Sequence, residues 1–303
     1  MIVFYSLIFP GGIFALIAGM MGWWIERKVT AMVQHRVGPP WNQNFYDVFK
    51  LFGKESIVPK ESASFLYIAS PIIAFGSCLT LSVVIGVPVF LGRIFAGDII
   101  LVIYLLTITT AAIFLGASAS SNVFASVGAN RELKMLLADE LVFIMIVLVP
   151  IIKSGFSFNL STIFEGAPAI FSVSGIIAYL LGLITIQAKL AIQPFDLAEA
   201  ETELAGGVEI EYSGVLLGIW KLTKGFEFFV LPLLLSVLFF GVPSSLNIMR
   251  FVWIAIFYLI TLVILIVLKN VNPRVTIKSM LNFFWKTMTP LALVAVVLAL
   301  LGV

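Results

Sequence analysis

Residues 172–240 read SVSGIIAYLLGLITIQAKLA IQPFDLAEAETELAGGVEIEY SGVLLGIWKLTKGFEFFVLPLLLSVLFF, two long apolar runs separated by a hydrophilic connection. Each run has at least the roughly 20 residues that an α-helix needs to cross the hydrocarbon core of a bilayer. The connection holds six of the chain's 16 carboxylates: Asp196, Glu199, Glu201, Glu203, Glu209 and Glu211. Crowded carboxylates repel one another, which favours the binding of protons or cations. This stretch therefore predicts membrane-spanning helices joined by an acidic loop at the membrane surface.

The same alternation extends over the whole chain of 303 residues, which is 61% hydrophobic and 11% charged. Soluble globular proteins have about 25% charged residues, so this composition excludes a soluble domain. Apolar runs of spanning length occupy residues 2–25, 65–90, 98–120, 133–152, 172–191, 213–240, 248–268 and 285–303. We expect an all-α polytopic integral membrane protein with about eight transmembrane helices in one domain, 1–303. The first run has no basic segment and no small-residue cleavage site, so we expect it to be retained.

Lys and Arg are distributed unevenly between the connections. Those after the first, third, fifth and seventh runs hold 13 of them, and the others hold only Arg93, Lys153 and Arg250. Because Lys and Arg accumulate in cytoplasmic connections, we expect the first set in the cytoplasm and both termini outside. The acidic loop, residues 194–212, is then cytoplasmic as well.

The longest of these connections, residues 26–64, contains a predicted amphipathic helix. Four apolar residues are spaced three and four apart, with polar residues between them, as in helices that lie along a membrane surface. They are Phe45, Val48, Phe49 and Phe52. The charged residues of this connection are candidates for docking a cytoplasmic partner: Glu26, Arg27, Arg36, Asp47, Lys50, Lys54 and Glu55.

Ionisable residues also lie inside the apolar runs, where a charge costs at least about 2.5–3.5 kcal/mol. Asp139 and Glu140 fall near the middle of the fourth run. Neighbours on a helix point about 100° apart, so we expect that they do not meet one partner and that at least one faces a hydrated cavity. Lys221, Lys224 and Glu227 share a helical face in the sixth run. With the loop carboxylates, these residues are the predicted sites of proton or cation coupling; the alternative is a solvated acidic loop.

The chain has one Cys and one His, Cys78 and His35. It therefore lacks the residues for a disulfide, a cysteine-ligated metal centre or a pair of haem ligands. We expect no redox cofactor in this chain, so that any such cofactor belongs to a partner.

Several ordered motifs are spread over nearly the whole chain. They are Glu26-Arg27-Lys28, Arg36-Val37-Gly38-Pro39, Asp47 with Lys50-Leu51-Phe52-Gly53-Lys54-Glu55, Pro194-Phe195-Asp196-Leu197-Ala198-Glu199-Ala200-Glu201-Thr202-Glu203-Leu204, and Glu211-Tyr212-Ser213-Gly214. Together they resemble the H subunit of respiratory complex I and its counterparts in the related hydrogenases. This resemblance implies an eight-span subunit at the junction of a hydrophilic redox arm and a membrane arm.

Two motifs depart from the quinone-reducing members, which usually have the sequence ETNRA before the Pro-Phe-Asp motif and a longer loop before the surface helix. Here Lys189-Leu190-Ala191-Ile192-Gln193 and Trp41-Asn42-Gln43-Asn44 take these places. Together with residues 130–140, they make the chain more similar to the ferredoxin-linked group, namely membrane-bound nickel–iron hydrogenases and sulfane reductases. Members of that group do not use a quinone.

We therefore interpret the chain as a non-catalytic membrane-anchor and coupling subunit of such a complex, in the plasma membrane of a prokaryote. The resemblance implies peripheral hydrogenase-like and iron–sulfur subunits, which would hold the iron–sulfur clusters and a nickel–iron or related centre. It also implies antiporter-like membrane partners within the lipid bilayer, and no nucleic acid. Two alternatives stay open: the H subunit of a quinone-reducing NADH dehydrogenase, forming part of the quinone site, and a stand-alone secondary transporter.

Overall fold

The computed structural model describes residues 2–93, 97–244 and 248–303, without the side chains of residues 2, 3, 201 and 202. Within these residues the chain is helical and has no β-strand. Seven helical segments are long and apolar enough to cross a membrane: Phe4–Val33 (α1, Ile2–Leu7, and α2, Gly12–Val33), α4 (Ser64–Leu91), α5 (Ile99–Ala119), α6 (Val123–Lys153), α10 (Gly214–Phe240), α11 (Ile248–Val271) and Ile277–Leu300. The last comprises α12 (Ile277–Phe283), a π-helical turn (Phe284–Met288) and α13 (Thr289–Leu300).

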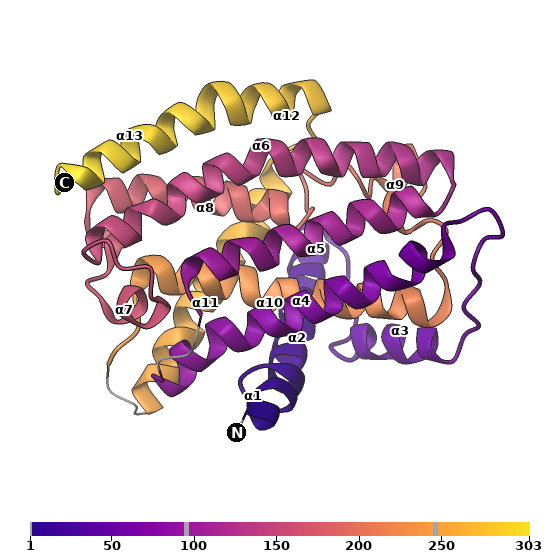
Figure 1. Cartoon of the computed structure of the whole chain (residues 1–303), viewed down its shortest axis with the longest axis horizontal. Helices are drawn as coiled ribbons and strands as arrows, with labels where there is room; N and C mark the ends of the chain where they lie inside the picture. Colours follow the sequence, from indigo (N-terminus) through magenta and orange to yellow (C-terminus); the bar gives the residue numbers. More distant parts are fainter. Residues whose placement is uncertain (1, 94–96, 245–247) are drawn as a thin grey trace.

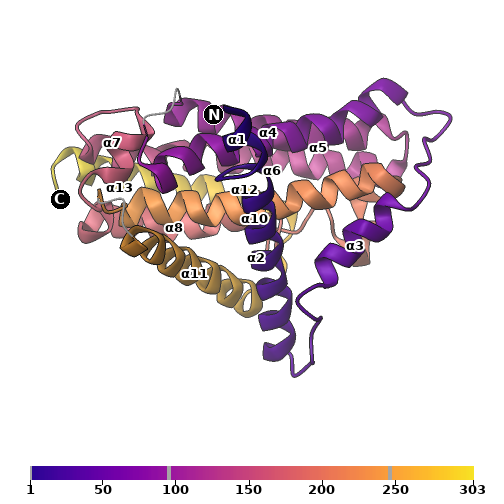
Figure 2. The ribbon, with the colours of Figure 1, turned by 90° about the horizontal axis from the view of Figure 1, so that it is seen from below.

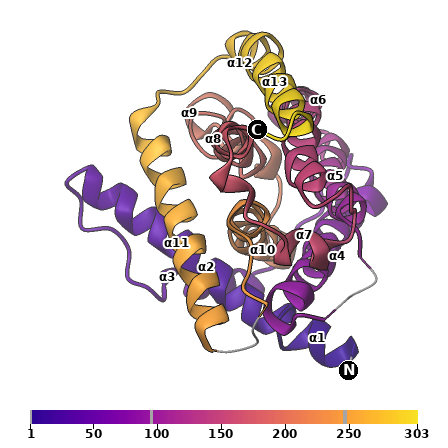
Figure 3. The ribbon, with the colours of Figure 1, turned by 90° about the vertical axis from the view of Figure 1, so that its left-hand side faces the viewer.

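One further apolar helix, α8 (Val173–Lys189), has 17 residues, about the minimum for crossing the hydrocarbon core. It packs against α6, α10, α11 and α13 inside the bundle (Figure 3). The predicted all-α membrane fold is confirmed, with seven long helices and this shorter one in the described part of the chain.

The bundle has two distinct ends (Figure 1). At one end, which we call the loop end, lie the acidic loop and α3 (Gln43–Phe52), together with the short helices α9 (Glu201–Leu204) and η2 (Gly207–Glu209). At the opposite end lie α7 (Leu160–Glu165) and the C-terminus, with η1 (Ala169–Phe171) following α7 in the chain, while α1 lies below the middle of the bundle in this view. The Val303 carbonyl there accepts a hydrogen bond from the Ser174 hydroxyl at 2.6 Å.

Helix α10 forms the centre of the bundle, because its residues from Gly225 to Phe239 are all buried. Helix α2 crosses it at a steep angle (Figure 2). Glycines allow this approach: a Cβ atom on Gly19 would lie 1.9 Å from the carbonyl oxygen of Gly225. Small residues at such crossings are typical of membrane helix bundles, since they bring two backbones into contact.

Two helices extend beyond the apolar runs that predicted them. Helix α2 continues to Val33, so that Glu26 and Arg27 lie in the helix and not in the following connection, where we expected them. Helix α6 begins at Val123, ten residues before the expected start, with the Asn122 side chain accepting a hydrogen bond from the backbone N–H of Phe124 at 2.7 Å. Hydropathy alone misses such helix ends, because they contain charged residues; two of these, Glu26 and Glu132, are buried against neighbouring protein.

The acidic loop is a folded part of the molecule. Ala198 and Val208 pack with Ala125 and Ala129 of α6 in a small buried cluster. Gly207 has a positive φ of 52° and lies so close to Ala198 that an added Cβ atom would be 1.9 Å from its carbonyl oxygen. This packing fixes the loop backbone against the bundle, which argues against the alternative of a mobile, fully solvated acidic loop.

Candidate functional site: a line of buried charges

Each carboxylate of the acidic loop whose side chain is described contacts a basic or amide group from another helix or connection. The closest pairs are Asp196 with Arg274 (2.6 Å), Glu199 with Lys224 (3.5 Å), Glu203 with Arg131 (2.6 Å), Glu209 with Lys221, and Glu211 with Asn122 (2.5 Å). The predicted mutual crowding of these carboxylates is therefore relieved by ion pairs. The side chain of Glu201, which we also predicted to take part, lies outside the described residues.

Two stacked tyrosines hold the end of this loop. The Tyr67 and Tyr212 rings lie 4.2 Å apart, and the Tyr67 hydroxyl donates a hydrogen bond to the Glu211 carbonyl at 2.7 Å. The Tyr212 hydroxyl donates to the Tyr67 carbonyl at 3.0 Å. Burial raises the pKa of the Tyr212 hydroxyl, so this reciprocal contact stays intact over the physiological pH range.

Helix α10 carries the predicted basic-basic-acidic series inward from the loop. Lys221 and Lys224 reach the loop carboxylates, and the Lys224 ammonium also donates a hydrogen bond to the Leu190 carbonyl at 2.7 Å. Glu227 lies one helical turn deeper and is 9% exposed. Its carboxylate forms no hydrogen bond or ion pair with another described residue.

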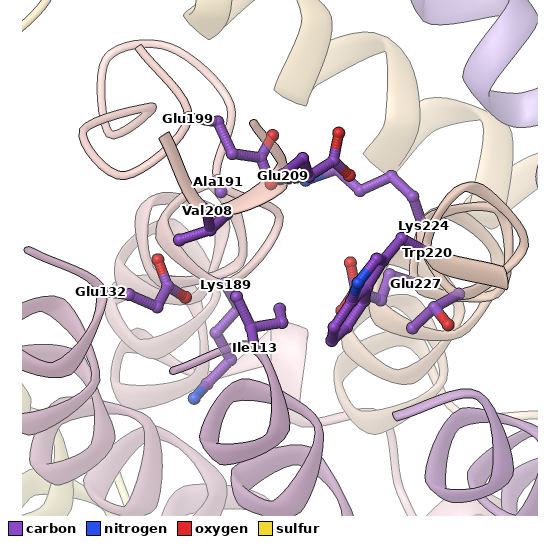
Figure 4. A pocket seen from close by; sticks show the side chains of 11 residues that line it. Ile113, Glu132, Lys189, Ala191, Glu199, Val208, Glu209, Trp220, Lys224 and Glu227 are labelled. Atoms are coloured by element: carbon purple, nitrogen blue, oxygen red, sulfur yellow. Dashed lines mark hydrogen bonds and ion pairs between the residues drawn. The ribbon is translucent and has the colours of Figure 1, made fainter. Parts of the chain in front are cut away.

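Glu227 faces a small cavity that also contains a carboxylate that our sequence analysis missed (Figure 4). This is Glu132 of α6, which is 5% exposed and likewise has no hydrogen bond or ion pair with a described residue. About 20 Å³ of the cavity is open to water centres, which is room for about one water molecule. The signal in the sequence was weak, because Glu132 directly precedes the apolar run 133–152 and was assigned to a connection.

Lys189 of α8 links this small cavity to the carboxylates in the middle of α6. Its side chain lines the cavity, and its ammonium lies 3.1 Å from Asp139 and 2.8 Å from Glu140. The expectation that these adjacent carboxylates cannot meet one partner was therefore wrong. An ammonium group has three donors and approaches between the two side chains, while the extra methylene of Glu140 offsets the difference in direction.

Asp139 and Glu140 differ in their other contacts. One carboxylate oxygen of Glu140 accepts a hydrogen bond from the Thr107 hydroxyl at 2.9 Å. Asp139 is 2% exposed, and its Oδ1 atom has no hydrogen-bond partner among the described residues. A buried carboxylate oxygen without a partner is energetically costly. The negative charge of Asp139 therefore depends closely on the positive charge of Lys189, which contacts its other oxygen.

A larger cavity of about 690 Å³ opens at the loop end. It is lined by residues of α2, α3, α10 and the acidic loop, and it shares Glu199, Glu209 and Lys224 with the small cavity. The charged side chains therefore form a continuous line from the loop end, through the small cavity, to Lys189 and the middle of α6. Helix packing thus brings together the three predicted groups of coupling residues, namely the adjacent carboxylates of α6, the carboxylates of the acidic loop and the charged series of α10. Glu203 and Glu211 lie at the edge of this line of charges.

Most of the predicted docking residues also line the large cavity. They are Glu26, Arg27, Asp47, Lys50 and Lys54. Glu26 is only 3% exposed and forms an ion pair with Lys269 of α11, so it is part of the cavity floor and not of an open surface. Arg36 and Glu55 are exposed and lie outside this lining.

In the described part of the chain, no group of three or more His, Cys, Asp or Glu residues is arranged to hold a metal ion. A bundle of apolar helices of spanning length with a line of buried charges defines a polytopic membrane protein. Comparisons with known proteins give the particular family.

Residues 7–300 match the sequence profile of the NADH dehydrogenase family. The chain is 33% identical over 300 residues to the H subunit of NADH-quinone oxidoreductase from Anoxybacillus flavithermus (strain DSM 21510 / WK1), a match that covers 93% of this chain and 89% of that protein. It is 32% identical to the same subunit from Geobacillus kaustophilus (strain HTA426), over 90% of this chain and 86% of the relative. The chain belongs to the NADH dehydrogenase family and is a membrane subunit of a complex I-like enzyme.

The fold is also similar to a chain in the structure of the membrane-bound sulfane sulfur reductase, an archaeal respiratory membrane complex. The TM-score is 0.87 at 28% sequence identity, and the match covers 99% of this chain and 100% of the other. The resemblance to both groups that the sequence motifs indicated is thus confirmed.

Proposed function

We propose that this subunit anchors a peripheral redox arm on the membrane and links electron transfer to the translocation of protons or sodium ions. The observation that supports this most directly is the continuous line of charges from the large cavity, past Glu227 and Glu132, to Lys189 in the bundle interior. Ionisable groups inside a membrane protein are costly and usually serve ion or proton pathways. A change of charge at the loop end would alter the protonation of the next group along this line.

The large cavity is the proposed contact site of the peripheral arm. Its charged lining residues come from five parts of the chain: α2, α3 with the residues after it, the acidic loop, α10, and the end of α11 with the connection after it. A partner at the loop end can cover them. The distribution of Lys and Arg supports a cytoplasmic location for this end. The proposed partners here are hydrogenase-like and iron–sulfur subunits that hold the metal centres, with antiporter-like subunits beside the bundle in the plasma membrane.

We favour a ferredoxin-linked complex of the hydrogenase or sulfane reductase type over a quinone reductase. Sites for apolar cofactors are lined mostly by hydrophobic and aromatic side chains, whereas twelve charged residues line the large cavity. The quinone-reducing alternative is kept because the relatives from Anoxybacillus and Geobacillus are quinone oxidoreductase subunits. All of these relatives are parts of multi-subunit enzymes, which argues against a stand-alone transporter.

Purification of the complex through a tag on this chain tests this choice. We expect iron–sulfur subunits to co-purify, with electron transfer from reduced ferredoxin and no stoichiometric quinone in the solvent extract. Tightly bound quinone, together with reduction of added quinone that is sensitive to changes in the large cavity, would instead establish the quinone-reducing alternative. Isolation of the chain without redox partners would contradict both.

The orientation of the chain can be tested with single cysteines in a background where Cys78 is replaced by Ser. A cysteine at Asn159, in the connection before α7, is expected to react with an impermeant thiol reagent added to intact cells. A cysteine at Asn42, before α3, is expected to react only after lysis. The reverse pattern would place the acidic loop outside and remove the basis for cytoplasmic docking.

Reversing charge at Lys50 and Lys54 together tests the docking site. Both side chains are exposed and line the large cavity. We expect Lys50→Glu with Lys54→Glu to release the peripheral subunits while this chain still inserts, because repulsion against a partner costs several kcal/mol. The matched control is Lys60→Glu, which reverses an exposed charge in the same connection outside the cavity lining. Co-purification at the wild-type level in the double variant would exclude this docking mode.

A further inference from the structure

The large cavity carries a surplus of positive charge. Seven basic and five acidic residues line it. Each acidic residue forms an ion pair with a different basic residue of the same lining. These pairs leave two of the basic residues over: Lys50, in the last turn of α3, and Lys54, just after that helix. Both side chains are exposed and form no ion pair or hydrogen bond with another described residue.

The acidic residues nearest in the sequence do not neutralise these two lysines. Asp47 lies three residues before Lys50, but one of its oxygens is 3.5 Å from Arg27 and the other accepts a hydrogen bond from a glutamine of α3 at 2.7 Å. Glu55 directly follows the second lysine, but it lies outside the cavity lining and forms no ion pair with a described residue. The two positive charges therefore remain available to another molecule.

A partner that covers the cavity has to compensate these two charges. Water solvates an exposed ammonium group, and a protein that covers the group without offering a counter-charge removes this solvation at a large energetic cost. Each lysine is therefore expected to meet a carboxylate once the cavity is covered. Lys50 and Lys54 are only four residues apart, so two carboxylates on one short stretch of a partner can reach both.

The composition of the lining favours a protein over a lipid as the occupant. A site for an acyl chain is lined mostly by hydrophobic side chains, whereas only six of the 20 residues that line this cavity are apolar. The others are the twelve charged residues and the amides Asn44 and Gln193. A charged lining of this kind suits the polar side chains of a soluble subunit.

We propose that an acidic segment of the peripheral arm docks at the large cavity and places one carboxylate against Lys50 and another against Lys54. This inference rests on the proposed function, because it names the chemistry of the partner that docks there. The internal ion pairs neutralise the rest of the charged lining, so these two lysines decide which sign of charge the cavity accepts. Helix α3, which carries the first of them, packs against α10 and α2 at the edge of the bundle (Figure 2).

Carbodiimide coupling of the whole purified complex tests this contact directly. The reagent takes up the water that is lost when an amine and a carboxylate in contact form an amide bond. We expect peptides in which Lys50 or Lys54 is joined to an Asp or Glu of one peripheral subunit. Lys60, which is exposed in the same connection but lies outside the lining, should give no such peptide. If the peripheral subunits co-purify but couple to neither lysine, the inference is wrong while the proposed docking holds; if none co-purifies, the proposed function itself is wrong.

Removal of single charges provides the second arm. Lys50→Gln and Lys54→Gln are each expected to speed release of the peripheral arm from the immobilised complex about 30-fold, because loss of one member of a buried charge pair acts mainly on dissociation. Lys60→Gln is the matched control and should release the arm at the wild-type rate. Lys50→Glu should regain slow release when the coupled carboxylate of the partner is replaced by Lys. Wild-type release by both Gln variants would overturn the proposal. An anionic phospholipid that the wild-type complex retains and both Gln variants lose would also overturn it, by assigning a lipid to the two lysines.

Discussion

Replacing Glu227 by Gln is expected to abolish ion translocation by the complex while leaving its redox chemistry with artificial dyes intact. Glu227 is buried, faces the small cavity and has no fixed partner among the described residues. Gln preserves the volume but cannot exchange a proton, so the ions moved per electron should fall by roughly 10²-fold, as when a positioned proton-transfer group is lost. Proton or sodium uptake into inverted vesicles, measured beside dye reduction, gives this ratio.

Two further variants define the extent of the line of charges. Glu140→Gln, which weakens the contact with Lys189, should also uncouple the complex, and Glu132→Gln should resemble Glu227→Gln. The matched control is Glu61→Gln, an exposed carboxylate in the connection before α4 that lines neither cavity. Full coupling in the Glu140, Glu132 and Glu227 variants would leave these buried carboxylates with a purely structural role.

Arg250→Met is expected to cause the largest loss of stability. The Arg250 side chain is 0% exposed and donates hydrogen bonds to the carbonyls of Val89 and Pro88 at 2.7 Å and of Pro243 at 2.9 Å. It also pairs with Glu165 at 3.2 Å. Methionine fills much of the space but leaves the Val89 and Pro243 carbonyls without these bonds, although the Pro88 carbonyl still accepts a hydrogen bond from the Gly92 N–H. Each buried acceptor left unsatisfied costs about 1–3 kcal/mol.

Denaturant titration of the chain in detergent micelles measures this loss as a change in the free energy of unfolding. Arg250→Lys should recover part of the stability, because an ammonium can still reach some of the carbonyls but lacks the planar fork of the guanidinium. Lys153→Met is the control, since Lys153 lies at the same end of the bundle and, among the described residues, its side chain forms only a 3.4 Å contact with the Val303 carbonyl. An unchanged midpoint for Arg250→Met would show that the four contacts contribute no net stability.

The sequence alone pointed to a residue of the candidate site where that residue differed clearly from its neighbours in the chain. Glu227, Asp139 and Glu140 were found because a charge within an apolar run stands out. Glu132 was missed because its burial depends on the acidic loop, about 70 residues further along the chain, which covers the first turns of α6. The prediction that Asp139 and Glu140 cannot share a partner was wrong, because it considered only the directions in which the two side chains leave the helix. It left out the length of the Lys189 side chain, whose ammonium contacts both carboxylates.

The sequence by itself determined that the chain is an all-α membrane protein, where its helices lie approximately, and which family it resembles. Transfer of a helix into lipid depends on the summed hydrophobicity of neighbouring residues, so this information is local. Only the tertiary structure decided which charges meet. The pairs of Glu26 with Lys269 and of Arg131 with Glu203 join residues far apart in the chain. Such pairs depend on the tilt and rotation of packed helices, which contacts along the whole bundle determine and no local pattern encodes.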